Sequence, residues 1–258
     1  MTKSVAGRPG SPRVRPGSSS VHRVAAVAGA AVLAGTAAVG VPGAAHAAPR
    51  LPTAAATVFG DCPPLPDGVD PARWRCEVHT AAPRLTLGDV TGGLAPITMT
   101  HAEGPMPDGG KGQVWGAMHS SPTAIPGGLT GIPAGDRATA GLAIQPEYGG
   151  RSDFYTGQLS LRFRLTGPLL PHSCAIGADA PVDFRLKRSG PSTWVSQDPP
   201  VIEFSAYDDT FTVPAAEHCG PLTGLLDRRL GLPATEGNLL SYDASYTFKT
   251  YDQLPPRG

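Results

Sequence analysis

Glycine and proline recur along the whole chain and constrain its fold more than any other feature. The sequence holds 33 Gly and 29 Pro, spread throughout and not gathered in one tract. Proline lacks an amide hydrogen and glycine adds backbone freedom, so both interrupt regular structure. We therefore expect many short elements joined by turns, without long helices.

Alternating stretches in the second half of the chain predict strands. In 158–166, leucine or phenylalanine at every second position alternates with serine, arginine or threonine. Strict alternation is typical of a strand with one buried and one wet face. The same period predicts strands within 181–188 and 241–251. Weaker strand signals lie at 84–90, 96–104, 112–119, 139–148, 200–207 and 209–214.

The segment 221–233 differs from the rest, because its leucines recur at helical spacing. The leucines expected on one helix face are Leu222, Leu225, Leu226 and Leu230. Gly231 stands where a C-terminal cap belongs, and Pro233 prevents the helix from continuing. The predicted fold is therefore all-β, an antiparallel β-sandwich or flattened barrel with one short helix near the C-terminus.

The first 47 residues predict a secretory signal peptide. They contain five basic residues and no acidic one, and an apolar run from Val24 to Val41 precedes the motif Ala45–Ala47. A basic region, an apolar region and an A-x-A site in this order predict cleavage between Ala47 and Ala48. The alternative is a membrane anchor, since the run approaches the roughly 18 residues of a span. Its alanines and glycines are only weakly apolar, which favours cleavage.

Residues 48–258 are predicted to form a single secreted β-rich domain, with a possible subdomain boundary around 120–136. Loss of the signal would leave 16 basic and 21 acidic residues, a net charge near −5. Nucleic-acid binding depends on a basic surface, so this charge argues against a nucleic-acid partner. We expect a secreted protein, at most loosely associated with the cell envelope and without stable membrane insertion once cleaved.

Four cysteines lie in the predicted mature chain: Cys62, Cys76, Cys174 and Cys219. An even number of cysteines in an exported chain favours disulfides. Three pairings are possible, and proximity in the sequence favours Cys62–Cys76 and Cys174–Cys219. The proline-rich loop of the first pair is expected to place Trp74 over the bridge, with Arg73 and Arg75 turned towards solvent.

Motifs for catalysis or metal binding are not found. The sequence has no G-x-S-x-G elbow, H-x-x-x-H or C-x-x-C. Adjacent His119 and Ser120 would point to opposite faces of a strand, which argues against a catalytic pair. The histidines after residue 47 are scattered singly: His79, His101, His119, His172 and His218. Because His172 and His218 lie close to cysteines, a Cys₂His₂ zinc cluster is conceivable, although disulfides are favoured. We predict no catalytic residue, cofactor-binding residue, metal ligand or cofactor.

Acidic and aromatic residues leave two further hypotheses open. Paired carboxylates for acid–base catalysis could come from Glu103, Asp153, Glu203 or Asp243, although nothing in the sequence pairs them. A sugar-binding platform could come from Trp74, Trp115, Trp194, Tyr148 and Tyr155. Packing in the core or at its rim is the favoured interpretation of these aromatic residues.

Six segments together resemble a group of exported actinobacterial proteins of unknown function. They are 59–81 (FGDCPPLPDGVDPARWRCEVHTA), 97–104 (ITMTHAEG), 128–133 (GLTGIP), 167–177 (GPLLPHSCAIG), 209–220 (DTFTVPAAEHCG) and 230–238 (LGLPATEGN). The resemblance covers nearly all of the predicted mature chain. It implies a secreted unit that contains all four cysteines, and it supplies no catalytic residues.

Two functions from different classes follow from these observations. The favoured one is a secreted, disulfide-stapled β-domain that acts as a non-catalytic binding or structural module, with an envelope polymer or a protein as partner. The alternative is an extracellular hydrolase of carbohydrate or another envelope polymer. The alternative requires acids such as Glu103, Asp153 and Glu203 to meet in one cleft.

Overall fold

The computed structural model describes residues 58–132 and 140–255. The predicted signal peptide 1–47, its cleavage site at Ala47 and Ala48, and part of the suggested boundary at 120–136 lie outside the described residues. Within the described residues, no helix combines the length and hydropathy needed to cross a membrane.

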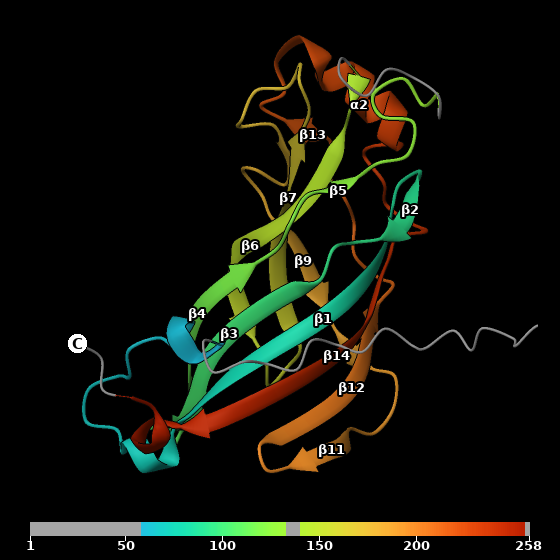
Figure 1. The fold of residues 1–258 in the computed structure, drawn as a ribbon. Helices are drawn as coiled ribbons and strands as arrows, with labels where there is room; N and C mark the ends of the chain where they lie inside the picture. The colour runs from blue at the N-terminus through green and yellow to red at the C-terminus, as the bar shows by residue number, and fades with distance from the viewer. Residues whose placement is uncertain (1–57, 133–139, 256–258) are drawn as a thin grey trace, which may run out of the picture. The chain divides into compact units, whose positions relative to one another are not determined.

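About half of the described residues form two antiparallel sheets (Figure 1). The larger sheet has eight strands, in the order β10-β12-β14-β1-β3-β4, with β11 beside β12 and β2 beside β1. Its strands are β1 (Arg75–Leu87), β2 (Val90–Gly93), β3 (Ile97–Pro105), β4 (Lys111–His119), β10 (Lys187–Arg188), β11 (Thr193–Gln197), β12 (Pro200–Asp208) and β14 (Leu239–Thr250).

The smaller sheet has six strands, in the order β13-β8-β7-β6-β5, with β9 beside β7. Its strands are β5 (Thr123–Ala124), β6 (Ala143–Asp153), β7 (Gln158–Thr166), β8 (Ala175–Ile176), β9 (Val182–Arg185) and β13 (Ala216–Glu217). Neither sheet closes on itself, so the predicted β-sandwich is confirmed and the flattened barrel is excluded.

The core lies between the sheets and follows the predicted alternation. In β7 the side chains of Leu159, Leu161, Phe163 and Leu165 are buried, and Arg162 on the other face is exposed. The same buried cluster includes residues from both sides of the suggested boundary, such as Leu85 of β1 and Leu165 of β7. Apolar side chains from both parts of the chain therefore share one core.

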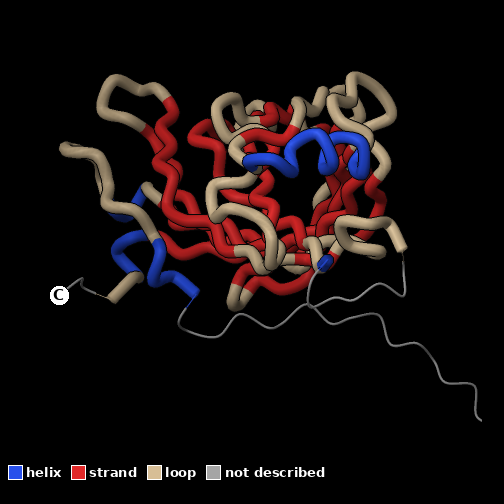
Figure 2. The backbone as a smooth tube through the Cα atoms, turned by 90° about the horizontal axis from the view of Figure 1, so that it is seen from above, coloured by secondary structure: helices blue, strands red, loops and turns tan. Residues whose placement is uncertain are grey.

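The predicted helix is α2 (Thr223–Leu230), and Gly231 ends it in the left-handed region with φ +67°. Seen from above, α2 lies over one end of the sheets (Figure 2). It meets the far end of β1 there, because the Leu230 carbonyl accepts a hydrogen bond of 2.8 Å from the Asp89 amide. Its buried stripe is narrower than predicted, since Leu226 and Leu230 are buried and Leu225 is 39 % exposed. The described residues also contain four short 3₁₀ helices: η1 (Val58–Asp61), η2 (Pro71–Arg73), η3 (Gly220–Leu222) and η4 (Tyr251–Gln253).

Two strand predictions need correction. The segment 209–214 is not a strand, because only Val213 forms an isolated bridge, to Ala234. By contrast, β1 begins at Arg75 and not near residue 84. Four consecutive residues from Cys76 to His79 are buried. Polar Glu77 and His79 alternate there with apolar Cys76 and Val78, but both faces of the strand are covered, so the polar side chains are buried too.

The structure contains the disulfides Cys62–Cys76 and Cys174–Cys219, the pairing that sequence proximity favours. The first joins the proline-rich loop to the start of β1. Trp74 is fully buried beside it and donates a hydrogen bond of 2.9 Å to the Pro105 carbonyl. A methyl group at Gly104 would come within 2.5 Å of the Trp74 ring, so this glycine is needed for the close approach.

Candidate functional site

Strand register gathers five ionisable side chains on the inner face of the larger sheet. Arg75, Glu77 and His79 share one face of β1, because side chains on a strand alternate between its faces. In the antiparallel pairing with β3, His101 lies opposite Glu77 and Glu103 lies opposite Arg75. Directly opposed residues have Cβ atoms about 5 Å apart, so the register alone brings these groups into contact.

Four of these side chains, those of Arg75, Glu77, His79 and Glu103, border a cavity of about 230 Å³ between the sheets, and His101 contacts them without lining it. Strands β1, β3, β12 and β14 and the turn between β6 and β7 line it. Its aromatic lining consists of Phe154, Tyr155, Phe204, Tyr242 and Tyr246. The exposed Arg188 also lines the cavity, with its guanidinium 3.5 Å from the Phe204 ring centre. The cavity therefore combines a charged floor with aromatic walls.

A larger hollow of about 580 Å³ lies among 124–128, 140–143 and neighbouring residues. The described residues that line it carry no titratable side chain. It offers no chemistry comparable to that of the smaller cavity.

Arg75 holds the outer oxygens of both carboxylates. Its Nε lies 2.6 Å from Oε1 of Glu77 and donates a hydrogen bond of 3.0 Å to Oε1 of Glu103, to which its Nη2 also donates. The other oxygen of each carboxylate faces the histidines. Oε2 of Glu77 lies 3.1 Å from Nε2 of His79 and 3.7 Å from Nε2 of His101. Oε2 of Glu103 lies 3.7 Å from the same nitrogen of His101. Arg75, predicted to face solvent, therefore lies at the centre of the site.

His101 is the residue whose surroundings are hardest to explain by packing. Its side chain is 1 % exposed, and neither ring nitrogen has a hydrogen-bond partner among the described residues. The 3.7 Å separations from the carboxylates exceed hydrogen-bonding distance. The ring stacks on Phe154, with centroids 3.9 Å apart and an interplanar angle of 4°. An unpaired buried polar group costs about 1–3 kcal/mol of folding free energy. The burial of His101 without a hydrogen-bond partner therefore lowers the stability of the fold.

Burial and charge set the protonation of the cluster. Burial lowers the pKa of His79, although its contact with Glu77 partly opposes this shift. Burial alone would raise the pKa of Glu103, but the contacts with His101 and Arg75 outweigh it and hold that pKa at about 2. Near neutral pH, His79 is therefore a neutral imidazole and Glu103 a carboxylate.

The acids considered for hydrolysis lie in separate parts of the structure, apart from Glu203 and Asp243, which line one hollow. Glu103 is in the cavity, whereas Asp153 accepts hydrogen bonds from the amides of Tyr155 and Thr156 in the turn after β6. Glu203 is exposed and lines a separate hollow that also includes Asp243. Glu103, Asp153 and Glu203 therefore do not meet in one cleft.

The other candidate residues serve different roles. Exposed His119 pairs with Asp61 at 2.7 Å, and exposed His218 pairs with Asp179 at 2.9 Å. His218 lies beside Cys219, but that cysteine is oxidised in its disulfide, so the Cys₂His₂ cluster does not form. Of the aromatic residues proposed for a sugar platform, only Tyr155 lines the cavity. Trp115 instead stacks on Tyr148 at 3.7 Å, and Trp194 is 55 % exposed.

Sequence reasoning missed Glu77, His79 and His101 as site residues. Their signal is a pair of short patterns, Glu-Val-His at 77–79 and His-Ala-Glu at 101–103, each with strand spacing. Either pattern alone is common, and only the antiparallel register of β1 and β3 joins them.

The fold and site define a disulfide-stapled β-sandwich with a polar cavity between its sheets. Comparisons of the chain with protein-family models, curated proteins and solved structures found no match.

Proposed function

We propose that the protein is an exported β-sandwich that binds a small polar ligand in the cavity between its sheets. The observation that carries this proposal is the cavity floor, where Arg75, Glu77, His79 and Glu103 line an aromatic-walled space and His101 lies 3.7 Å from both carboxylates. Buried charges and imidazoles are costly to a fold, and they recur where a protein needs them for recognition or chemistry.

The size and lining of the cavity indicate the class of ligand. At about 230 Å³ it is smaller than the roughly 300–1,000 Å³ of sites for drug-sized ligands. The aromatic walls provide flat apolar contact, and the polar floor fixes orientation through directed hydrogen bonds. A compact molecule with several polar groups suits this combination.

Export has separate support. Two disulfides and the absence of free cysteines among the described residues fit an oxidising compartment. The basic and apolar N-terminal pattern predicts the route, and kinship with the exported actinobacterial proteins that the chain resembles would agree with it. Secretion with loose attachment to the envelope, through a polymer or a protein, belongs to the same proposal.

Ligand binding is favoured over hydrolysis because of the state of the Glu103 carboxylate. A general acid needs a pKa raised towards the working pH. The low pKa of Glu103, about 2, keeps this group ionised and leaves it unable to donate a proton near neutral pH.

Filling the cavity tests ligand binding. Ala206 of β12 is 3 % exposed and lines the cavity, so Ala206→Leu extends a side chain into the ligand space. We expect the variant to fold and to lose at least tenfold in affinity for the ligand, about 1.4 kcal/mol. The measurement is native mass spectrometry after incubation with the low-molecular-weight fraction of spent culture medium.

Ala82→Leu is the matched control, because Ala82 is exposed on β1 and is not among the cavity-lining residues. It should bind as the unaltered protein does. Absence of any non-covalent adduct on the unaltered protein, or equal adducts on both variants, would contradict the proposal.

Export is tested by fractionation of cells and medium. We expect to recover the chain from the medium, with the mass of a protein whose first residue is Ala48. Recovery of the uncleaved chain in the membrane fraction alone would show that the apolar run is retained as an anchor.

A further inference from the structure

Glu77, His79 and His101 bring three metal-binding atoms together. One ligand atom from each residue lies within 4.8 Å of the other two, and all three residues are buried. Oε2 of Glu77 is central, 3.1 Å from Nε2 of His79 and 3.7 Å from Nε2 of His101. Neighbouring ligands of a tetrahedral zinc ion with bonds of about 2.0–2.1 Å stand about 3.3 Å apart. Of the two separations from Oε2 of Glu77, one is shorter than this spacing and the other is longer.

We propose that Glu77, His79 and His101 coordinate a divalent first-row transition-metal ion, with Zn²⁺ as the best-fitting example. This inference rests on the proposed ligand cavity and names the chemistry at its floor. The open coordination position would face the cavity, where the small ligand or a water would bind. Two imidazoles and one carboxylate with an open position form a donor set typical of catalytic and binding metal sites.

A metal ion accounts for the unpaired state of His101. Its nitrogens have no hydrogen-bond partner among the described residues, and its ring is 1 % exposed. A coordinate bond to Nε2 would satisfy one of these nitrogens without another protein group. The stacking on Phe154 then fixes the ring plane, which keeps the nitrogen aimed at the two carboxylates.

The charge of the cluster also suits a cation. The side chains of Glu77 and Glu103 are only 6 % and 10 % exposed, and buried carboxylates need a positive partner. A divalent ion beside them would add positive charge at the cavity floor, which favours an anionic or strongly polar ligand group. The metal and the proposed ligand therefore support each other.

Arg75 and Gln113 position the carboxylates. Arg75 holds Oε1 of both glutamates, which leaves Oε2 of each directed towards His101. Gln113 of β4 donates a weak hydrogen bond of 3.4 Å to Oε2 of Glu103 and accepts one of 3.0 Å from the Phe154 amide. Glu103 lies close enough to become a further ligand or to accept a hydrogen bond from a metal-bound water.

The two imidazole nitrogens and the carboxylate oxygen determine which metal ions the site prefers. Imidazole nitrogens suit zinc and its neighbours in the first transition row, whereas calcium and magnesium prefer oxygen ligands. Redox-active ions share this donor chemistry with Zn²⁺, so the test compares Zn²⁺, Co²⁺ and Mn²⁺ with Mg²⁺ and Ca²⁺.

The experiment is calorimetric titration of chelator-treated protein with each chloride salt. We expect one Zn²⁺ ion per chain, and no measurable Mg²⁺ or Ca²⁺ binding at the same concentrations. His101→Phe retains a ring to stack on Phe154 and removes both nitrogens, so it should fold and bind Zn²⁺ at least about 100-fold more weakly. Glu77→Gln provides a second variant should the first unfold. Visible absorption of bound Co²⁺ should disappear in the same variants.

His119→Phe and His218→Phe are the matched controls, because these exposed histidines pair with Asp61 and Asp179 on the surface. They should bind as the unaltered protein does. No Zn²⁺ binding to folded protein, or unchanged binding by both His101→Phe and Glu77→Gln, would overturn the metal site. If Zn²⁺ fails to bind while Ala206→Leu still abolishes a ligand adduct, the metal inference alone is wrong. If Zn²⁺ binds and no adduct is found, the proposed function is wrong and the metal site stands.

Discussion

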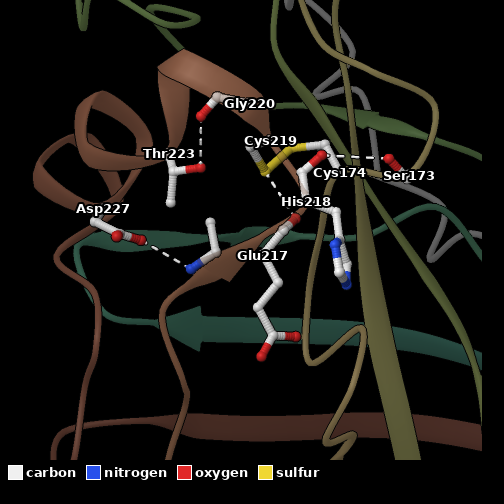
Figure 3. Close-up of a disulfide and its surroundings, with 9 residues drawn as sticks. Ser173, Cys174, Glu217, His218, Cys219, Gly220, Thr223 and Asp227 are labelled. Carbon is white, nitrogen blue, oxygen red and sulfur yellow. Dashed lines mark hydrogen bonds between the residues drawn. A yellow bond between two sulfur atoms is a disulfide. The ribbon is translucent and has the colours of Figure 1, made fainter.

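Joint replacement of Cys174 and Cys219 by alanine is expected to lower the free energy of unfolding by about 4 kcal/mol. The disulfide closes a loop with a sequence separation of 45, and breaking it returns that freedom to the unfolded chain. Both cysteines are fully buried. Figure 3 shows the bridge near Gly220, Thr223 and Asp227, so it anchors the start of η3 and α2 to β8.

Urea unfolding of the oxidised protein measures this loss. The comparison is the Cys62→Ala, Cys76→Ala variant, whose separation of 14 predicts a smaller loss of about 3 kcal/mol. A loss below about 1 kcal/mol for the Cys174, Cys219 variant would show that its disulfide adds little to the fold.

Asp208→Ala is expected to cost about 1–3 kcal/mol, because it removes the buried acceptor of three hydrogen bonds. Asp208 ends β12 and is 1 % exposed. Its Oδ2 accepts a hydrogen bond of 2.6 Å from the Arg185 amide, and its Oδ1 accepts from the amide and hydroxyl of Thr210 at 2.8 and 2.7 Å. The residue therefore ties β12 to β9 in the other sheet.

Asp209→Ala is its control. Asp209 is exposed and reaches only Lys187, at 3.7 Å, so its loss should change stability by less than about 0.5 kcal/mol. Thermal unfolding of the two variants side by side makes the comparison. Equal stabilities would mean that the buried carboxylate adds nothing to the junction of the sheets.

Helices and strands were predictable from the sequence wherever one face of the element is buried and the other is exposed to solvent. The alternation in β7 and the Gly231 cap of α2 are local signals, and both are confirmed. The burial of both faces at the start of β1 was not predictable, because a polar side chain such as that of Glu77 usually faces solvent. Strand order was also beyond the sequence, since β14 pairs with β1 across most of the chain.

The site was not predictable for a related reason. Glu77 and His101 are far apart in the sequence, and their contact depends on the register of two strands. Arg75 was expected in solvent, as arginine usually is. Its side chain is 41 % exposed, and its guanidinium contacts the two carboxylates that the same register places beside it.

The most direct measurement of the central claim is anomalous diffraction at the zinc absorption edge from crystals grown with Zn²⁺. The account predicts the strongest peak within about 2.0–2.2 Å of Nε2 of His79, Nε2 of His101 and Oε2 of Glu77. Peaks confined to the exposed His119–Asp61 and His218–Asp179 pairs, with none in the cavity, would contradict it.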